Sequence, residues 1–334
     1  MPSWRRSLPV IVASVAAVAA ALLLWQLVDV LLLVFAGILL ALLLRAPADW
    51  LARRTPLSPG WALAVVILVA AVAIGGAGWL FGAQLAGQLG ELAHKLPKLV
   101  ESLKDRLAQY DWISNALSSG DIAPDGKVIG RGIGALAATF GALTYVVVVF
   151  FAGLFLAAQP RLYVEGVLRL VPQRGRPRAR EVLGDLAHTL RSWLIGQAVL
   201  MLAMGALTTV GLLLLGVPMP LALGLLAGLL EFIPYLGPVL WAVPALLVAL
   251  SQSVTLAGYT LALYVVLQSL EGHILQPLVQ RKTVSLPPAL LLIAQVAFGA
   301  LLGVLGVMLA TPATAALLVV VKKLYVEDVL NEPA

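Results

Sequence analysis

The sequence predicts an all-α polytopic membrane protein with about six to eight transmembrane helices and two oppositely oriented helical hairpins. Its 334 residues are 61% hydrophobic and 11% charged, whereas a soluble domain carries about 25% charged residues. Apolar runs recur at lengths that can cross a bilayer. The strict alternation of polar and apolar residues that a membrane barrel requires is absent. These three observations make helices in lipid the predicted architecture.

Residues 1–81 form the predicted N-terminal membrane region. It opens with the basic stretch MPSWRRS and continues into an apolar run that is longer than the roughly 7–15 residues of a signal peptide core. A second apolar run follows almost at once, so we expect an uncleaved helical hairpin and then a third span. The three runs are Leu8–Val28, Val30–Leu44 and Trp61–Phe81. The residues between the second and third runs, which include Arg45, Pro47, Arg53 and Arg54, are expected to form a loop.

Residues 82–131 are more polar and are predicted to form an extracytoplasmic amphipathic helical region. Leucines recur in it at alternating spacings of four and three, which indicates a heptad seam. Such a helix packs either on the membrane domain of its own chain or on another subunit of a homo-oligomer. Pro97 is expected to kink it. The seam consists of Leu85, Leu89, Leu92, Leu96, Leu99 and Leu103.

Residues 132–193 are predicted to hold a fourth span, Gly132–Ala158, and then a strongly basic segment, Arg161–Arg191. Apolar residues recur at helical spacing opposite the charges of that segment, which is typical of an amphipathic helix on a cytoplasmic membrane surface. Residues 194–322 form the predicted transport core, which contains a fifth span, Leu194–Leu215, and a further span, Val254–Leu270. Its last apolar stretch, Leu286–Val321, is expected to be interrupted at Gly303, Gly306 and Thr311-Pro312. Residues 323–334 form a cytoplasmic tail.

The positions of lysine and arginine predict the topology of the core. Cytoplasmic loops carry the excess of positive charge, which places both termini in the cytoplasm and region 82–131 outside. The half-segments Leu221–Phe232 and Val239–Leu250 would each be about 18 Å long as helices, short of the roughly 30 Å hydrocarbon core. We therefore expect one hairpin that dips in from outside and a second, 286–321, that enters from the cytoplasm. Such an arrangement is consistent with an inverted repeat.

The candidate site centres on the tip of the first hairpin. Glu231 directly precedes a break that two prolines and a glycine impose on the helix. Non-helical backbone at membrane depth is tolerated where it is buried in protein or lines a watery passage, and an ionisable residue there indicates function. The alternative is that the tip reaches the headgroups and Glu231 is hydrated. The predicted residues of the break are Pro234, Tyr235, Gly237 and Pro238.

A second polar cluster follows the next span. Glu271 and His273 either relay protons or cap helix ends at the cytoplasmic boundary. The glutamines near apolar segments either bind a small polar solute or join helices by hydrogen bonds. Pro312 interrupts the last apolar stretch. The predicted polar residues are Gln197, Gln268, Glu271, His273, Gln276 and Gln295.

Several classes of function are disfavoured. The chain has no cysteine and three histidines, too few soft or imidazole ligands for a closed metal site. Walker A, H-E-x-x-H and G-x-S-x-G motifs are absent. We therefore expect no enzyme activity, no cofactor and no metal. The net charge of +6 is better explained by cytoplasmic anchoring of helices than by nucleic-acid binding.

Three groups of residues stand out in the C-terminal half: Gly196-Gln197, then Phe232-Ile233-Pro234-Tyr235-Leu236-Gly237-Pro238, and then Glu271, Ile274, Leu275, Pro277, Val284, Leu286, Pro288, Gly303, Gly306 and Pro312. In these residues the chain resembles the autoinducer-2 exporter family of permeases. The resemblance covers 190–322 closely and 1–160 mainly by topology. It implies transport without ATP, re-entrant elements and homo-oligomers, pentamers among them.

The sequence and the resemblance together predict a secondary transporter of the cytoplasmic membrane. Its expected substrate is a small molecule such as an autoinducer-2-like solute, and its partners are the lipid bilayer and further copies of the chain. A sodium/proton antiporter on the same architecture is one alternative. A channel or a membrane scaffold is another.

Overall fold

The computed structural model describes residues 27–107, 139–280 and 287–330, and all regular structure in these ranges is helical. Five of the described helices are long and apolar enough to cross a membrane, or six if one bent pair is counted as a span. The chain is therefore a multi-pass helical membrane protein, as its composition predicts. The first apolar run up to residue 26, residues 108–131 of the predicted amphipathic region, residues 132–138 of the predicted fourth span and the tail after 330 lie outside the described residues.

The first described helix, α2 (Val28–Arg54), is longer than the sequence predicts. The expected loop around Arg45 and Arg53 is wrong, because both residues and Pro47 are helical. Arg45 pairs with Asp49 one turn later at 3.4 Å, which supports the continued helix. The helix ends at Thr55, which is extended (φ −131°, ψ 158°). Thr55 precedes Pro56, and a residue before proline disfavours the helical conformation.

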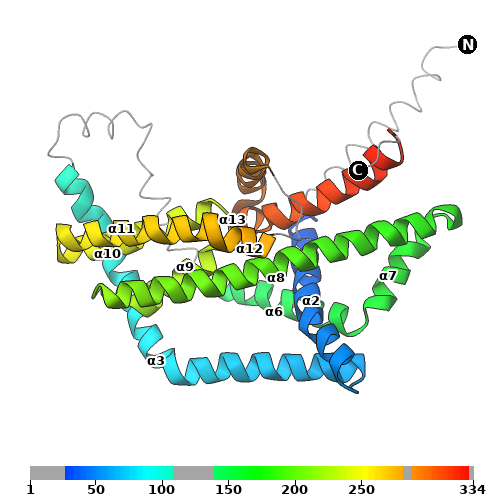
Figure 1. Cartoon of the computed structure of the whole chain (residues 1–334), viewed down its shortest axis with the longest axis horizontal. Helices are drawn as coiled ribbons and strands as arrows, with labels where there is room; N and C mark the ends of the chain where they lie inside the picture. The colour runs from blue at the N-terminus through cyan, green and yellow to red at the C-terminus, as the bar shows by residue number, and fades with distance from the viewer. Residues whose placement is uncertain (1–26, 108–138, 281–286, 331–334) are drawn as a thin grey trace, which may run out of the picture.

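Helix α3 (Pro59–Leu107) runs on through the predicted boundary at residue 81 and includes Pro97. Figure 1 shows that it changes direction along its length, first running along the lower edge of the molecule and then rising toward the core. Leu92 is buried in that core, and Leu85 and Leu99 pack against it. One face of the heptad seam thus lies on the chain's own membrane domain.

The basic segment after α6 (Thr139–Ala158) is not the single surface helix that its pattern predicts. It divides into a short helix, α7 (Pro160–Arg169), and the start of a 39-residue helix, α8 (Arg176–Leu214). A 3₁₀ turn, η1 (Gln173–Gly175), joins them. Helix α7 is bent by 87° from α6. The charged first turns of α8 therefore continue straight into the predicted fifth span.

The predicted break is confirmed. Helix α9 (Pro220–Leu230) and helix α10 (Leu236–Gln252) are short apolar helices separated by a turn. Gly237 and Pro238, expected within the break, instead form the first turn of α10, where proline is tolerated because the first N–H groups have no helical partner. Next come α11 (Val254–Leu270), the π-helix η2 (Glu271–Leu275) and α12 (Gln276–Gln280). The predicted bounds of the Val254–Leu270 span are confirmed.

The last apolar stretch forms α13 (Pro288–Val321) and the π-helix η3 (Lys322–Glu327). The helix is broken at Gly303, whose φ of 64° and ψ of −150° are not helical. Beyond the break, a Cβ on Gly306 would overlap the carbonyl oxygen of Phe298, so the two halves pack closely against each other there. The expected interruption at Gly303 is confirmed. The interruption expected at Pro312 is wrong, because Pro312 is helical and buried within the second half of α13.

Three clusters of buried side chains hold the described helices together, and two of them lie around the break. The first surrounds Trp241 and joins α3, α8, α9, α10 and α11. The second joins α2 and α8 to the second half of α13, and Phe232 from the break packs against it. Gly224 and Gly228 allow α9 to approach α8 so closely that added Cβ atoms would lie 2.9 Å and 2.8 Å from backbone carbonyl oxygens of α8. The break is thus enclosed between α8 and α13.

Candidate functional site

The turn between α9 and α10 places non-helical backbone inside the protein. Tyr235 has a φ of 66° and a ψ of −46°, an unfavourable combination for a residue with a side chain. The turn is closed by hydrogen bonds from the Leu236 amide to the Pro234 carbonyl and from the Gly237 amide to the Ile233 carbonyl, both 2.8 Å long. Backbone strain of this kind concentrates at functional sites.

Position 237 next to this turn has room only for glycine. A Cβ at this position would overlap the carbonyl oxygen of Leu230, the last residue of α9. The close approach keeps the end of α9 and the start of α10 in contact. The sequence predicts a helix-breaking role for this glycine, but its backbone is helical and its role is steric.

Side-chain amides from two other helices bind the carbonyl groups that the turn leaves without helical partners. Gln197 on α8 donates from Nε2 to the Glu231 carbonyl oxygen at 2.5 Å. Gln295 on α13 donates from Nε2 to the Pro234 carbonyl oxygen at 2.8 Å. Both side chains are buried. In lipid, unwound backbone needs such partners because water does not provide them.

A third amide supports the start of α9. The side chain of Gln88 on α3 accepts a hydrogen bond from the Ala222 amide through Oε1, at 3.0 Å. Ala222 is in the first turn of α9, where backbone N–H groups have no helical acceptor, and the residue that precedes the helix provides no side-chain cap. Helix α3 therefore supports the start of α9, whereas α8 and α13 support the turn between α9 and α10.

Two buried carboxyl groups meet at the break. Glu231 is 2% exposed and Glu271 is 5% exposed, and their side chains interact through a hydrogen bond and through charge. Among the described residues, neither carboxyl has a lysine, arginine or histidine nitrogen within 4.0 Å. Two adjacent carboxyls without a cation cannot both be ionised at low cost.

Glu271 is held by two further glutamines. Gln268 donates to Oε2 at 3.0 Å and Gln276 donates to Oε1 at 2.9 Å. Glu271 opens η2, the π-helical turn between α11 and α12. A π-helical turn widens the helix locally and occurs frequently at functional sites. The π-helix explains how Gln276, five residues away, reaches the same carboxyl as Gln268, three residues away.

Several buried polar atoms have no hydrogen-bond partner among the described residues. Two lie at the break: Oε2 of Glu231, which is part of the turn, and Oε1 of Gln295, which reaches the turn from α13. A third is Nε1 of Trp241, whose ring packs edge to face on Tyr264 with centroids 5.5 Å apart. Tyr264 in turn lies within electrostatic range of both carboxyls. Unpartnered buried polar atoms are costly, so each of these atoms is available to a polar group of a ligand. The remaining two are Oγ1 of Thr208 and Oγ1 of Thr311.

The structure brings most of the predicted residues together and separates a few. Gln197, Glu231, Pro234, Gln268, Glu271, Gln276 and Gln295 form one connected group. His273 is exposed, and its Nδ1 lies 2.9 Å from the Ser269 carbonyl on its own helix. Tyr235 is largely exposed, and Pro238 and Pro312 are buried. No cluster of metal ligands occurs in the part of the chain that the structure describes.

Sequence reasoning missed Gln88, Trp241 and Tyr264. Gln88 carries a signal that could have found it, because it lies on the core-facing side of the leucine seam, between Leu85 and Leu92. Trp241 and Tyr264 resemble ordinary membrane aromatics, and only their packing against each other beside the carboxyls distinguishes them.

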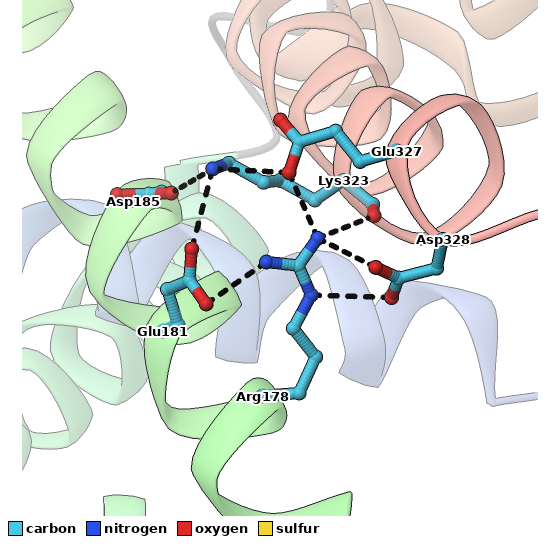
Figure 2. A network of polar contacts seen from close by, with 6 residues as sticks. All are labelled: Arg178, Glu181, Asp185, Lys323, Glu327 and Asp328. Atoms are coloured by element: carbon cyan, nitrogen blue, oxygen red, sulfur yellow. Dashed lines mark hydrogen bonds and ion pairs between the residues drawn. The ribbon is translucent and has the colours of Figure 1, made fainter. Parts of the chain in front are cut away.

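A second polar network joins the start of α8 to the C-terminal π-helix (Figure 2). Arg178 on α8 forms ion pairs with Glu181, Glu327 and Asp328, each 2.8 Å long, and Lys323 pairs with Asp185 at 3.1 Å. Arg178 also donates to the Lys323 carbonyl oxygen at 2.8 Å. This network links α8, which carries Gln197, to the end of α13, which carries Gln295.

Comparisons with known proteins agree with this architecture. The sequence profile described as AI-2E family transporter matches residues 12–325. The chain is 29% identical over 266 residues to "Putative transport protein YrrI" of Bacillus subtilis, covering 75% of each chain. It is 28% identical over 292 residues to "Putative transport protein MT0215" of Mycobacterium tuberculosis, covering 84% of this chain and 79% of that one.

A third relative is "Putative permease PerM" of Escherichia coli, 26% identical over 230 residues, which are 68% of this chain and 65% of that protein. The matched region of the family profile contains the broken helix, both carboxyls and all three glutamines that hold the break. The chain belongs to the AI-2E family of transporters.

Proposed function

We propose that this protein is a secondary transporter that moves a small polar solute across the cytoplasmic membrane without ATP. The observation that carries the proposal is the buried Glu231–Glu271 pair beside unwound backbone. Unwound helices at the middle of a membrane are how many secondary transporters build a substrate site. Membership of a transporter family supports the same class of function.

The carboxyl pair is the coupling group in this proposal. In this proposal the two acids share one proton, because two adjacent carboxylates without a cation repel each other. A proton that enters or leaves the pair changes the charge of the site by one. The pair can therefore exchange a proton for a solute, and a proton gradient can drive transport. Gln268 and Gln276 keep Glu271 in place during the exchange.

Autoinducer-2-like molecules remain our proposed substrate class, on the strength of the family's description and of the polar atoms at the site. Trp241 presents an unpartnered donor, and Glu231 and Gln295 present unpartnered oxygens. A small solute with several oxygen atoms satisfies both kinds of group. The same two oxygens favour a second candidate, a sodium/proton antiporter, because carboxylate and amide oxygens also bind cations.

The proposed setting is the cytoplasmic membrane, with both termini inside and several copies of the chain together. Basic residues concentrate at the α2–α3 connection and around α7, which supports a cytoplasmic location for these segments. The two interrupted segments, α9–α10 and α13, are then hairpins that enter from opposite sides. A homo-oligomer, such as a pentamer, is the proposed assembly.

Flux into reconstituted vesicles tests this function. Purified protein is placed in vesicles under an imposed proton or sodium gradient, and uptake of candidate solutes is followed. A carrier gives saturable flux that responds to one of the gradients. A channel gives flux that does not saturate, and a scaffold gives none. Either of the last two outcomes would refute the proposal.

A further inference from the structure

The short basic helix α7 is placed where a helix lies along a membrane surface. It follows α6, an apolar helix, at an angle of 87°. If α6 crosses the bilayer, α7 runs nearly parallel to its plane. Arg45 on α2 fixes the bend, since it donates from Nε to the Ala157 carbonyl at 2.7 Å and from a terminal nitrogen to the Ala158 carbonyl at 3.4 Å. These contacts bind the last carbonyls of α6.

The side chains of α7 are sorted by chemistry around the helix. At 100° per residue, Tyr163, Val167 and Leu170 share one side, and Arg161 and Arg169 point to the other. The apolar side is not covered by protein: Val167 is 50% exposed and Leu170 is 87% exposed. Leu168 lies beside Arg161 around the helix, outside the apolar side; it is buried and attaches α7 to the rest of the chain. An exposed apolar face opposite basic residues suits the boundary between acyl chains and headgroups.

Three of the described arginines are neutralised by acidic side chains. Arg45, Arg178 and Arg191 each form an ion pair with an acidic side chain. By contrast, three exposed arginines of α7 and the turn after it have no ion-pair partner within the described ranges; they are Arg161, Arg169 and Arg174. One acidic residue, Glu165, lies among them. The free charge of this surface is therefore positive.

Exposed aromatic residues on the neighbouring helices also indicate a membrane interface. Trp50, near the end of α2, and Trp61, at the start of α3, are both exposed. The Arg54 guanidinium lies 4.7 Å from the centre of the Trp50 ring. Tryptophan concentrates at the membrane–water interface, and α2 packs against α6 close to the bend that begins α7. Two independent signals thus place α7 in the interface.

We propose that α7 is an interfacial helix that binds anionic phospholipid headgroups through Arg161, Arg169 and Arg174. Its apolar side lies among the outer acyl carbons, and the three arginines contact phosphates of the leaflet that α7 faces. A basic residue near an anionic membrane surface contributes about 1 kcal/mol, which corresponds to a local enrichment of about fivefold. This inference is independent of the transported solute, since it concerns a surface distant in sequence from both carboxyls.

Quenching by brominated lipids tests the proposal. Because the chain has no cysteine, Val167→Cys gives a single site for a fluorescent label on the apolar side of α7. The full-length protein is reconstituted in phosphatidylcholine that contains either brominated phosphatidylcholine or brominated phosphatidylglycerol. We expect the brominated phosphatidylglycerol to quench several-fold more strongly than its fraction in the bilayer predicts. The excess disappears in the triple variant Arg161→Gln, Arg169→Gln, Arg174→Gln.

Two controls make the result decisive. A label at Val72→Cys, on the exposed part of α3, is expected to show equal quenching by the two lipids. High salt is expected to remove the excess at position 167 without any mutation, because it screens the charges. Equal quenching at low salt would overturn the proposal, and so would an excess that survives both the triple variant and high salt. A label at 167 that neither lipid quenches would show that α7 faces water or protein.

Discussion

At the scale of single residues, the site is a pair of acids enclosed by amides. Glu231 and Glu271 come from different helices, and three glutamines bind either Glu271 or the Glu231 backbone. None of these amides brings a charge, so they hold the site without neutralising it. An arginine or a lysine in their place would fix both carboxyls in the ionised form. The amides leave the pair free to exchange a proton.

Glu231→Gln is predicted to abolish the response of solute flux to a pH gradient while leaving expression unchanged. The substitution keeps the size of the side chain and removes the titrating group. Glu271→Gln should have the same effect, and the double variant should lose no more than either single one, because the pair acts as a unit. The measurement is flux at several imposed pH gradients.

The matched control is Glu165→Gln, which removes an exposed carboxyl on α7. Its flux should respond to pH as the wild type does. If Glu231→Gln keeps the full pH response, the carboxyl pair is not the coupling group.

Gln295→Leu is predicted to destabilise the protein by roughly 0.6–1.7 kcal/mol, which are the average and the maximum found for hydrogen bonds between membrane helices. We expect the upper half of that range, because the Pro234 carbonyl is outside a helix and loses its Gln295 partner. Unfolding in detergent measures the change. Gln252→Leu, at the exposed end of α10, is the control and should change stability little.

At the scale of elements, the two interruptions have different physical causes. The α9–α10 break is a five-residue turn that other helices support, whereas α13 is interrupted at a single glycine. The backbone of Gly303 lies in a region that is essentially restricted to glycine. Tertiary contacts stabilise the α9–α10 break, whereas the break in α13 depends on the backbone conformation of Gly303.

Gly237→Ala is predicted to destabilise the protein by about 1–3 kcal/mol, the usual cost of overpacking, because the new Cβ meets the backbone of Leu230. Gly303→Ala should cost about the same, for the different reason of backbone strain. Thermal unfolding of the purified variants provides the comparison. Gly258→Ala is the control: nothing lies within 4 Å of its Cβ, and alanine in a helix is favoured over glycine by about 1 kcal/mol.

The elements also show what the sequence can and cannot predict. The break at Glu231–Tyr235 was predictable because it contains Pro234, and proline interrupts a helix locally. The bounds of α11 were predictable from its uninterrupted apolar run. The extension of α2 through Arg45 and Pro47 was not, since arginine and proline are loop signals unless an ion pair and helix packing outweigh them.

The contacts around the site depend on tertiary structure in the same way. The amide of Gln197 reaches a carbonyl 34 residues away, and that of Gln295 reaches one 61 residues away. Sequence could name these glutamines as polar residues in apolar helices. It could not distinguish a solute ligand from a partner for unwound backbone, because both use the same amide.

At the scale of the whole molecule, the charged network of Figure 2 joins the start of α8 to the segment that follows α13. Arg178→Gln is predicted to release the C-terminal segment from α8, because one guanidinium contacts three acidic side chains and a carbonyl. Trypsin should then cleave faster after Lys322 and Lys323. Limited proteolysis in detergent measures the rate.

Arg180→Gln is the control for this experiment, since Arg180 is exposed and has no ion pair among the described residues. High salt should accelerate cleavage of the wild type toward the rate of the Arg178 variant, because exposed ion pairs are screened. Equal rates for all three proteins would mean that the network does not hold the segment.

The proposed opposite orientation of the two interrupted segments concerns the whole molecule and can be tested by chemical access. Single cysteines at Leu236, at the start of α10, and at Leu302, beside Gly303, are predicted to react with membrane-impermeant reagents from opposite sides of the bilayer. The 11 residues of α9 span about 17 Å, which is too short to cross the roughly 30 Å hydrocarbon core. We therefore expect each pair of half-helices to leave the membrane on the side from which it entered. Labelling in sealed vesicles of known orientation measures the side. Reaction of both cysteines from the same side would contradict the inverted arrangement of the two broken helices. The proposed passage would then have to be formed by the carboxyl pair and α8 alone.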